Sequence, residues 1–131
     1  MKYILVVIML LLVVLLFAQQ AYFKRLSATD FKMTIDKYNL EKTDFVLLDI
    51  RTLPEFEAGH IEGAQILDFY SKDFVQNLNN LDRNLPYLIY CRSGNRTGQT
   101  MGLMQKLDFK NVSDLKNGIN SWIQADYKVV K

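Results

Sequence analysis

The chain has 131 residues, with 16 basic and 14 acidic side chains and a formal net charge of +2. This near balance, without a basic stripe, excludes the electrostatic footprint of a nucleic-acid-binding protein. A single cysteine, Cys91, excludes an internal disulfide and a metal site built from several cysteines.

The N-terminal segment is apolar and suited to a membrane, unlike the rest of the chain. Residues 3–18 carry no charged side chain, and with Gln19 and Gln20 tolerated the apolar stretch runs to Phe23. Its 21 residues, as a helix rising about 1.5 Å per residue, would cross a hydrocarbon layer of about 30 Å. We therefore predict an uncleaved transmembrane anchor over residues 1–25, with residues 3–23 in the membrane. A cleaved secretory signal is the alternative, although the exit after Ala18 lacks a small residue at −3.

The basic residues around this segment predict its orientation. Lys24, Arg25 and two further lysines follow the span, whereas only Lys2 and the amino terminus precede it. On the positive-inside rule, we expect a single-pass protein of the cell membrane with its domain on the cytoplasmic side. An exported, anchored domain is the alternative. In either orientation, Lys24 and Arg25 would lie at the membrane edge.

Residues 26–131 alternate short apolar runs with amphipathic segments. We expect helices over 29–38, 52–59, 71–78, 97–107 and 118–124, and strands over 45–48, 65–67, 86–90, 112–114 and 129–130. This alternation predicts one α/β domain with a mainly parallel sheet. Such sheets bind ligands outside the carboxyl ends of their strands. Asp49 and Cys91 each follow an apolar strand directly, so both are expected at the same edge.

The loop after Cys91 has the composition of an anion site. Residues 92–95 include Gly94 and small polar residues, which lets successive backbone N–H groups turn inward. The helix that follows, together with Arg92 and Arg96, adds positive potential, so we expect Cys91 to be a nucleophilic thiolate at neutral pH. The same loop would stabilise a persulfide anion. An inert buried thiol is the alternative, but two arginines and a polar loop favour the reactive role.

Three segments carry a family resemblance. Residues 91–97 (CRSGNRT) resemble the active-site loop of rhodanese-like sulfurtransferases. Residues 49–64 resemble the amino-terminal signature of that family, and residues 115–122 its closing segment, with Asn117 where a second glycine is usual. The resemblance covers about residues 28–127 and implies five parallel strands flanked by helices, with a persulfide formed on Cys91. The active-site loop would comprise Cys91, Arg92, Ser93, Gly94, Asn95, Arg96 and Thr97.

The loop spacing and the resemblance together predict the substrate class. Phosphatases of the related cysteine-loop type use a C-x5-R spacing, whereas Arg96 gives C-x4-R and Thr97 occupies the x5 position. In the family, a basic residue directly after the cysteine implies thiosulfate, so Arg92 is expected to bind the sulfonate group. We predict a thiosulfate sulfurtransferase that passes sulfur to cyanide or a thiol.

Two other functions stay open at this point. One is a persulfide carrier or redox sensor without turnover, which would serve a membrane-associated protein partner. The other is phosphatase or arsenate-reductase chemistry on the same scaffold, which the loop length disfavours.

The remaining polar residues near the predicted edge have structural interpretations. We expect Asp49 to brace the edge against Arg51 or Arg96, because thiosulfate cleavage needs no proton abstraction from an ionised thiol. Glu55 is interpreted as a partner of a helix dipole. The lone histidine, at position 60, has no partner for a metal, so we predict neither metal nor cofactor. Gly98 and Gly102, four residues apart, predict close packing of their helix against the sheet.

Overall fold

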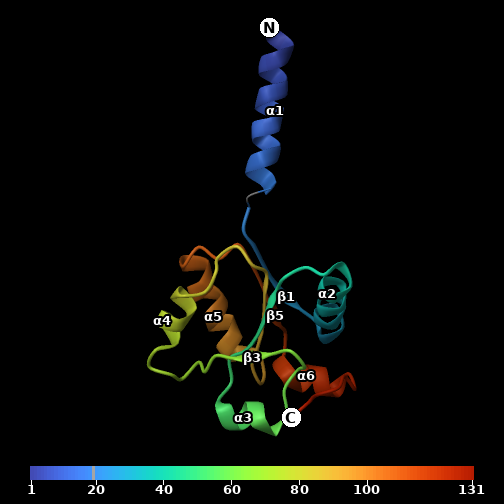
Figure 1. The fold of residues 1–131 in the computed structure, drawn as a ribbon, viewed down its shortest axis with the longest axis vertical. Helices are drawn as coiled ribbons and strands as arrows, with labels where there is room; N and C mark the ends of the chain where they lie inside the picture. The colour runs from blue at the N-terminus through green and yellow to red at the C-terminus, as the bar shows by residue number, and fades with distance from the viewer. Residues whose placement is uncertain (19) are drawn as a thin grey trace.

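The structure, a computed structural model, describes residues 1–18 and 20–131. Its centre is a sheet of five parallel strands in the order β1-β5-β4-β2-β3. The strands are β1 (Tyr22–Leu26), β2 (Val46–Asp49), β3 (Gln65–Ile66), β4 (Tyr87–Tyr90) and β5 (Asn111–Leu115). The helices are α1 (Lys2–Ala18), α2 (Ala28–Glu41), α3 (Leu53–Ala58), α4 (Phe74–Asn79), α5 (Asn95–Lys106) and α6 (Gly118–Gln124). The predicted α/β fold with five parallel strands is confirmed (Figure 1).

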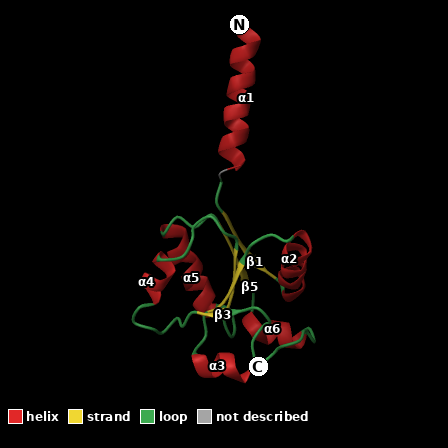
Figure 2. Cartoon of the chain, in the orientation of Figure 1, coloured by secondary structure: helices red, strands yellow, loops and turns green. Residues whose placement is uncertain are grey.

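Helices cover both faces of the sheet, with α4 and α5 on one side and α2 and α6 on the other (Figure 2). Successive residues of a strand point to opposite faces, so each central strand contributes to two cores. Leu47 and Leu88 pack on the α2–α6 side, whereas Leu48 and Ile89 pack on the α4–α5 side. This double burial explains why these strands appear in the sequence as continuous apolar runs.

The predicted starts of two helices are supported by their capping contacts. Ser27 accepts a hydrogen bond from the backbone N–H of Asp30 at 3.1 Å at the start of α2. At the start of α3, Thr52 and Glu55 form a capping box, in which the Glu55 carboxylate accepts from the Thr52 N–H at 3.0 Å. Both caps satisfy donors that a helix leaves unpaired at its first turn.

The identity of one edge strand differs from the prediction. Residues 129–130 form no named strand, and Val130 makes only an isolated antiparallel bridge to His60. The fifth strand is β1, which pairs in parallel with β5. Tyr22 and Phe23 continue the apolar N-terminal run, which is why the sequence pattern places them in the anchor. The domain boundary predicted after residue 25 falls inside β1.

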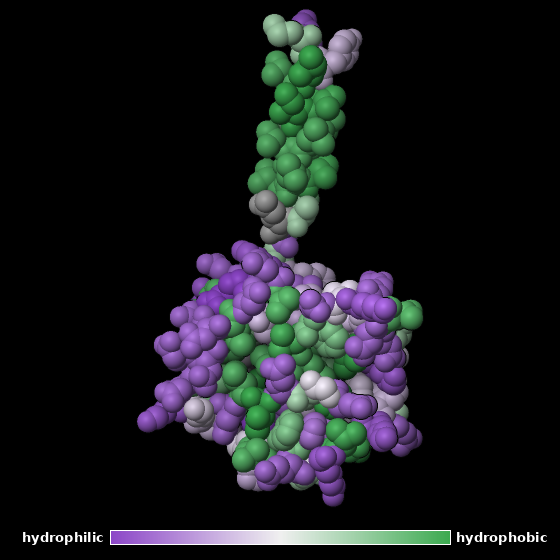
Figure 3. All heavy atoms as spheres, in the orientation of Figure 1, coloured by the Kyte–Doolittle hydropathy of each residue, from purple (hydrophilic) through white to green (hydrophobic). Residues whose placement is uncertain are grey.

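The structure does not support the predicted transmembrane anchor. Among residues 1–18 and 20–131, no helix is long and apolar enough to cross a membrane. The apolar helix α1 has 17 residues, about 25 Å at 1.5 Å each, because the chain has entered β1 by Tyr22. Every residue of α1 is exposed, and beyond its N-terminal end the surface of the helix is apolar on the visible face (Figure 3). Gln19, part of the predicted span, lies outside the described residues.

The first turn of α6 meets the backbone of the loop that follows β4. The N–H of Ile119 donates to the carbonyl of Cys91 at 2.9 Å, and the N–H of Asn120 donates to the carbonyl of Arg92 at 3.2 Å. Gly118 has a φ of +61°, and a Cβ there would collide with the carbonyl group of Arg92. The fold therefore requires a glycine at this position, both for its conformation and for its space.

Gly118→Ala should lower stability by about 2 kcal/mol or more, because the methyl group collides with backbone and the left-handed conformation strains it. Gly102→Ala is the matched control, since Gly102 is an exposed residue within α5 and a Cβ there would have no neighbouring atom within 4 Å. That variant should gain about 0.5–1 kcal/mol through helix propensity. Urea unfolding of both variants measures the difference. Equal stabilities would contradict the steric argument.

Candidate active site

The carboxyl ends of β2 and β4 bring Asp49 and Cys91 to one edge of the sheet, as predicted. Asp49 lies opposite Tyr90 in the strand register, and Cys91 follows Tyr90. Cys91 packs in the α4–α5 core and is 1% exposed. Asp49 follows Leu48, which points into that same core, so its side chain lies on the other face of the sheet. The two residues share an edge without facing each other.

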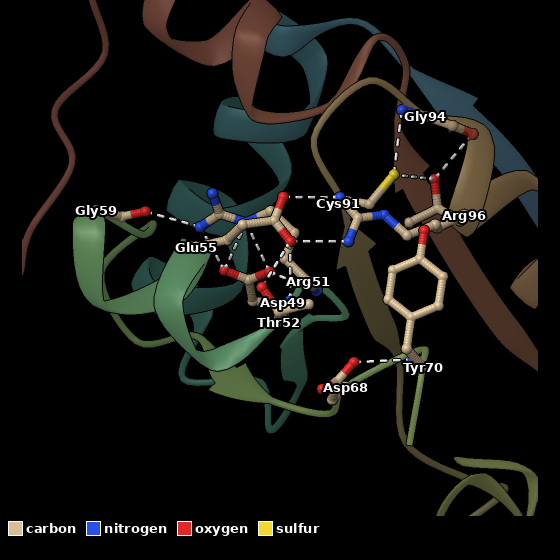
Figure 4. Close-up of polar contacts among 11 residues, drawn as sticks. Asp49, Arg51, Thr52, Glu55, Gly59, Asp68, Tyr70, Cys91, Gly94 and Arg96 are labelled. Carbon is tan, nitrogen blue, oxygen red and sulfur yellow. Dashed lines mark hydrogen bonds and ion pairs between the residues drawn. The ribbon is translucent and has the colours of Figure 1, made fainter. Parts of the chain in front are cut away.

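The loop after Cys91 directs a backbone donor at the sulfur. The N–H of Gly94 lies 3.1 Å from Cys91 Sγ (Figure 4). The hydroxyl oxygen of Thr97 lies 3.7 Å from the same sulfur atom. Gly94 has a φ of +96° and forms the N-cap of α5, so the chain turns sharply here and begins the helix at Asn95. An anion on Cys91 therefore lies beside a donated N–H and at the positive end of a twelve-residue helix.

The side chain of Arg96 is committed to an ion pair with α3. Its two terminal nitrogens lie 2.9 Å from the two oxygens of Glu55, and its guanidinium lies 5.5 Å from the centre of the Tyr70 ring (Figure 4). The hydrogen bond from Arg96 lowers the pKa of Glu55 to about 2, against the opposing effect of burial and with help from Thr52. This pair fastens the start of α5 to the start of α3, which sequence reasoning did not predict.

Asp49 and Arg51 form a second ion pair, buried on the other face of the edge. Arg51 donates to both carboxylate oxygens, with its shortest contact at 2.7 Å, and to the carbonyl of Gly59 at 2.7 Å (Figure 4). Tyr90 lies opposite Asp49 in the strand register, and its pKa is raised mainly because it is buried and secondly because of the negative charge of Asp49. The partner of Asp49 is thus Arg51 and not Arg96, and the geometry matches a bracing role.

The other loop residues are open to solvent. Arg92, Ser93 and Asn95 are exposed, and no ion pair involves Arg92 within the described part of the chain. Arg92 lines a groove of about 320 Å³ whose apolar side is formed by Ile119, Ile123 and Val129. A larger hollow of about 480 Å³ lies against α2, and none of residues 91–97 line it. Of the two arginines in the described loop, Arg92 is therefore the one that is exposed and in no ion pair.

Arg25 and Asp114 form a third ion pair, which the sequence pattern also did not predict. Arg25 donates to both carboxylate oxygens of Asp114, at 3.1 and 2.9 Å, and Thr97 donates to the same carboxylate at 2.7 Å. The two partners are 89 positions apart in the chain. The prediction that Arg25 lies at a membrane edge is not supported, and no local signal in the sequence indicates its contact with Asp114.

The pair between Glu55 and Arg96 should make stability depend on pH in the acid range. The folded pKa of Glu55 is about 2, below its ordinary value of 4.5, so the pair contributes stability above pH 4.5 that is lost as the pH falls towards 2. The melting temperature of the wild type should therefore fall more steeply over this range than that of Glu55→Gln. Circular dichroism melts at several pH values measure both slopes. Asp36→Asn, which removes an exposed pair with Lys32, is the control and should keep the wild-type slope. Parallel slopes for the wild type and Glu55→Gln would contradict the assignment.

Comparisons with known proteins agree with this fold. The family model of the rhodanese-like domain matches residues 28–125. The thiosulfate sulfurtransferase GlpE of Pseudomonas putida is 33% identical over 98 residues, which cover 72% of this chain and 86% of that protein. A tRNA uridine(34) hydroxylase of Wigglesworthia glossinidia brevipalpis is 37% identical over 103 residues, but the match covers 72% of this chain and only 32% of that protein. The crystal structure of a rhodanese-related protein from Thermoplasma volcanium shares the fold, with a TM-score of 0.69 at 24% identity over 82% of this chain and 97% of that one. The chain belongs to the rhodanese-like domain family.

Proposed function

We propose that the protein is a sulfurtransferase that moves the outer sulfur of thiosulfate, through a persulfide on Cys91, to a thiol or cyanide. The observation that carries the proposal is the N–H of Gly94 at 3.1 Å from Cys91 Sγ, at the start of α5. A donor in that position favours a sulfur anion over a neutral thiol. The likeness to a thiosulfate sulfurtransferase over most of that protein supports the same chemistry.

The reaction consists of two displacements at sulfur. In the first, the Cys91 thiolate attacks the outer sulfur of thiosulfate, a new S–S bond forms, and the old S–S bond breaks as sulfite leaves with its electron pair. In the second, an acceptor thiolate attacks the terminal sulfur of the persulfide and returns Cys91 to the thiolate. Cyanide as the acceptor gives thiocyanate. Each half-reaction restores the charge on Cys91, so no cofactor is required.

The geometry favours sulfur transfer over phosphoryl transfer. A phosphatase of the cysteine-loop type needs a free guanidinium to hold the phosphoryl oxygens. Arg96 instead makes two hydrogen bonds to Glu55. Arg92, which is exposed beside the groove, is left to bind the sulfonate end of a donor. The tRNA hydroxylase relative is about three times the length of the match, so its activity is not proposed for this chain.

Incubation of the purified protein with thiosulfate should add the mass of one sulfur atom to Cys91 and release one equivalent of sulfite. Intact-mass spectrometry and a sulfite assay measure the two products. Cys91→Ser should give neither. A variant without Cys91 that still released sulfite would overturn the proposal. Steady-state kinetics with cyanide should be ping-pong, whereas one turnover followed by a stall would indicate a persulfide carrier.

Arg92→Gln should raise the KM for thiosulfate about tenfold and change kcat little, because the lost charge-assisted hydrogen bond to the sulfonate acts mainly in binding. Initial-rate kinetics over a range of thiosulfate concentrations separate the two parameters. Lys72→Gln removes an exposed charge outside the loop and groove and should leave KM unchanged. An unchanged KM in Arg92→Gln would show that another group binds the donor.

Location at a cell membrane, with the domain on the cytoplasmic side, stays a prediction of the sequence.

A further inference from the structure

A chain of hydrogen bonds links Cys91 to the edge strand β1, and the two displacements described above do not use it. The hydroxyl oxygen of Thr97 lies 3.7 Å from Cys91 Sγ and 2.7 Å from Asp114 Oδ2. Arg25 donates to Asp114 through Nε at 3.1 Å and Nη2 at 2.9 Å. Nη2 of Arg25 also donates to the carbonyl of Gly94 at 2.6 Å. Arg25 therefore contacts the loop directly and also acts on it through Asp114.

The hydroxyl of Thr97 has one hydrogen, and its partners decide where that hydrogen points. Two acceptors lie near it, the carboxylate of Asp114 at 2.7 Å and the carbonyl of Gly94 at 3.2 Å, and the carboxylate is the nearer and is charged. Thr97 consequently donates to Asp114 and presents a lone pair to the sulfur of Cys91. In this arrangement Thr97 can accept a hydrogen bond from the thiol form of Cys91, but it cannot donate one to the thiolate.

The buried carboxylate of Asp114 is paired with Arg25. Asp114 is completely buried, and a buried carboxylate without a cation is costly. Arg25 supplies the cation from a side chain that is 47% exposed. The hydrogen bond to Asp114 raises the pKa of Arg25, against burial, and the charges of Asp114 and Cys91 add to the rise. Arg25 is thus a permanent cation beside both groups.

Arg25 also fits closely against the turn that directs the Gly94 N–H at the sulfur. A Cβ on Gly94 would lie 2.9 Å from Nη2 of Arg25, and a Cβ on Gly98 would lie 3.8 Å from the same atom. Gly98 therefore lies beside a side chain of β1, in line with the predicted packing, whereas a Cβ on Gly102 would have no neighbouring atom within 4 Å, contrary to it.

We propose that Arg25 and Asp114 are positioning residues for Cys91. Asp114 sets the orientation of the Thr97 hydroxyl, and Arg25 holds both Asp114 and the carbonyl of Gly94. Their opposite charges also balance each other next to the sulfur. Loss of either partner should therefore change the reactivity of Cys91 in opposite directions. The proposal concerns the sulfur itself and rests on the proposed function only where sulfur transfer is the readout.

The other charges around Cys91 are paired or exposed. Arg96 of α5 faces Cys91, and its charge is neutralised by Glu55 of α3. Arg92, in the loop, faces solvent. The pair of Asp49 and Arg51 lies on the other face of the sheet. Changes at Arg25 and Asp114 leave all of these pairs in place.

The test measures the pH at which alkylation of Cys91 by iodoacetamide reaches half its maximal rate, followed by intact mass. Cys91 is the only cysteine, so the signal reports one site. Asp114→Asn removes the negative charge beside the sulfur and leaves the charge of Arg25 unbalanced, so the midpoint should move down by about one pH unit. Arg25→Met leaves the Asp114 charge near the sulfur without a cation, so the midpoint should move up by a similar amount.

Two further variants separate positioning from general damage. Arg25→Lys keeps the positive charge but loses the planar guanidinium group that donates to two partners at once. The pH midpoint of alkylation should therefore stay unchanged, while sulfur loading from thiosulfate slows about tenfold. Lys24→Met removes an exposed charge from the same strand and should change neither value. If Arg25→Met does not fold, Asp114→Asn and Arg25→Lys still decide the question.

Shifts of Asp114→Asn and Arg25→Met in the same direction, or an unmoved midpoint in Asp114→Asn, would overturn the proposal. Alkylation does not require sulfur transfer. If the wild type formed no persulfide while the opposite shifts were observed, the proposed function would fail and the positioning role would stand.

Discussion

The orientation of the peptide groups after Cys91 depends on where their carbonyl oxygens find partners. The carbonyls of Cys91 and Arg92 are held by the first turn of α6, and the carbonyl of Gly94 is held by Arg25. Since the C=O and N–H of one peptide point in opposite directions, these contacts also fix the N–H groups of Arg92, Ser93 and Asn95, on both sides of the Gly94 donor. The loop is therefore organised by elements on both sides before any donor arrives. Such preorganisation is what allows backbone donors to stabilise an anion without a cost of rearrangement.

Ion pairs at the same edge assign different tasks to its arginines. Arg51 and Arg96 are each bound by a carboxylate, at 2.7 and 2.9 Å, and so serve to fasten elements together. Desolvating such pairs is costly, and their geometry must be good to offset the cost. Here the two pairs connect the end of β2 to Gly59 and the start of α3 to the start of α5. Arg92 differs because it is exposed and is not part of such a pair in the described structure, which leaves its charge available to a substrate.

The sequence predicted that Asp49 and Cys91 share one edge of the sheet, but it did not predict the ion pairs around them. The reason is that the paired residues are far apart in the chain. Short apolar runs followed by Asp49 and Cys91 predicted a shared edge, because parallel strands end on the same side. The partner of Arg96 is 41 positions away, and that of Arg25 is 89 positions away. No local pattern encodes contacts of that separation. β1 was missed for a related reason, since the apolar residues Tyr22 and Phe23 extend an already apolar segment.

Pairing of the edge strand is consequently part of the site. In the register between β1 and β5, Arg25 lies directly opposite Asp114, so both side chains point to the face on which α5 begins. A slip of one residue would turn Arg25 to the other face and bring Lys24 or Leu26 opposite Asp114. The buried carboxylate would then lose its cation, and the carbonyl of Gly94 would lose its donor. The five-residue strand β1, which follows α1, thereby controls the surroundings of Cys91 through the side chain of Arg25.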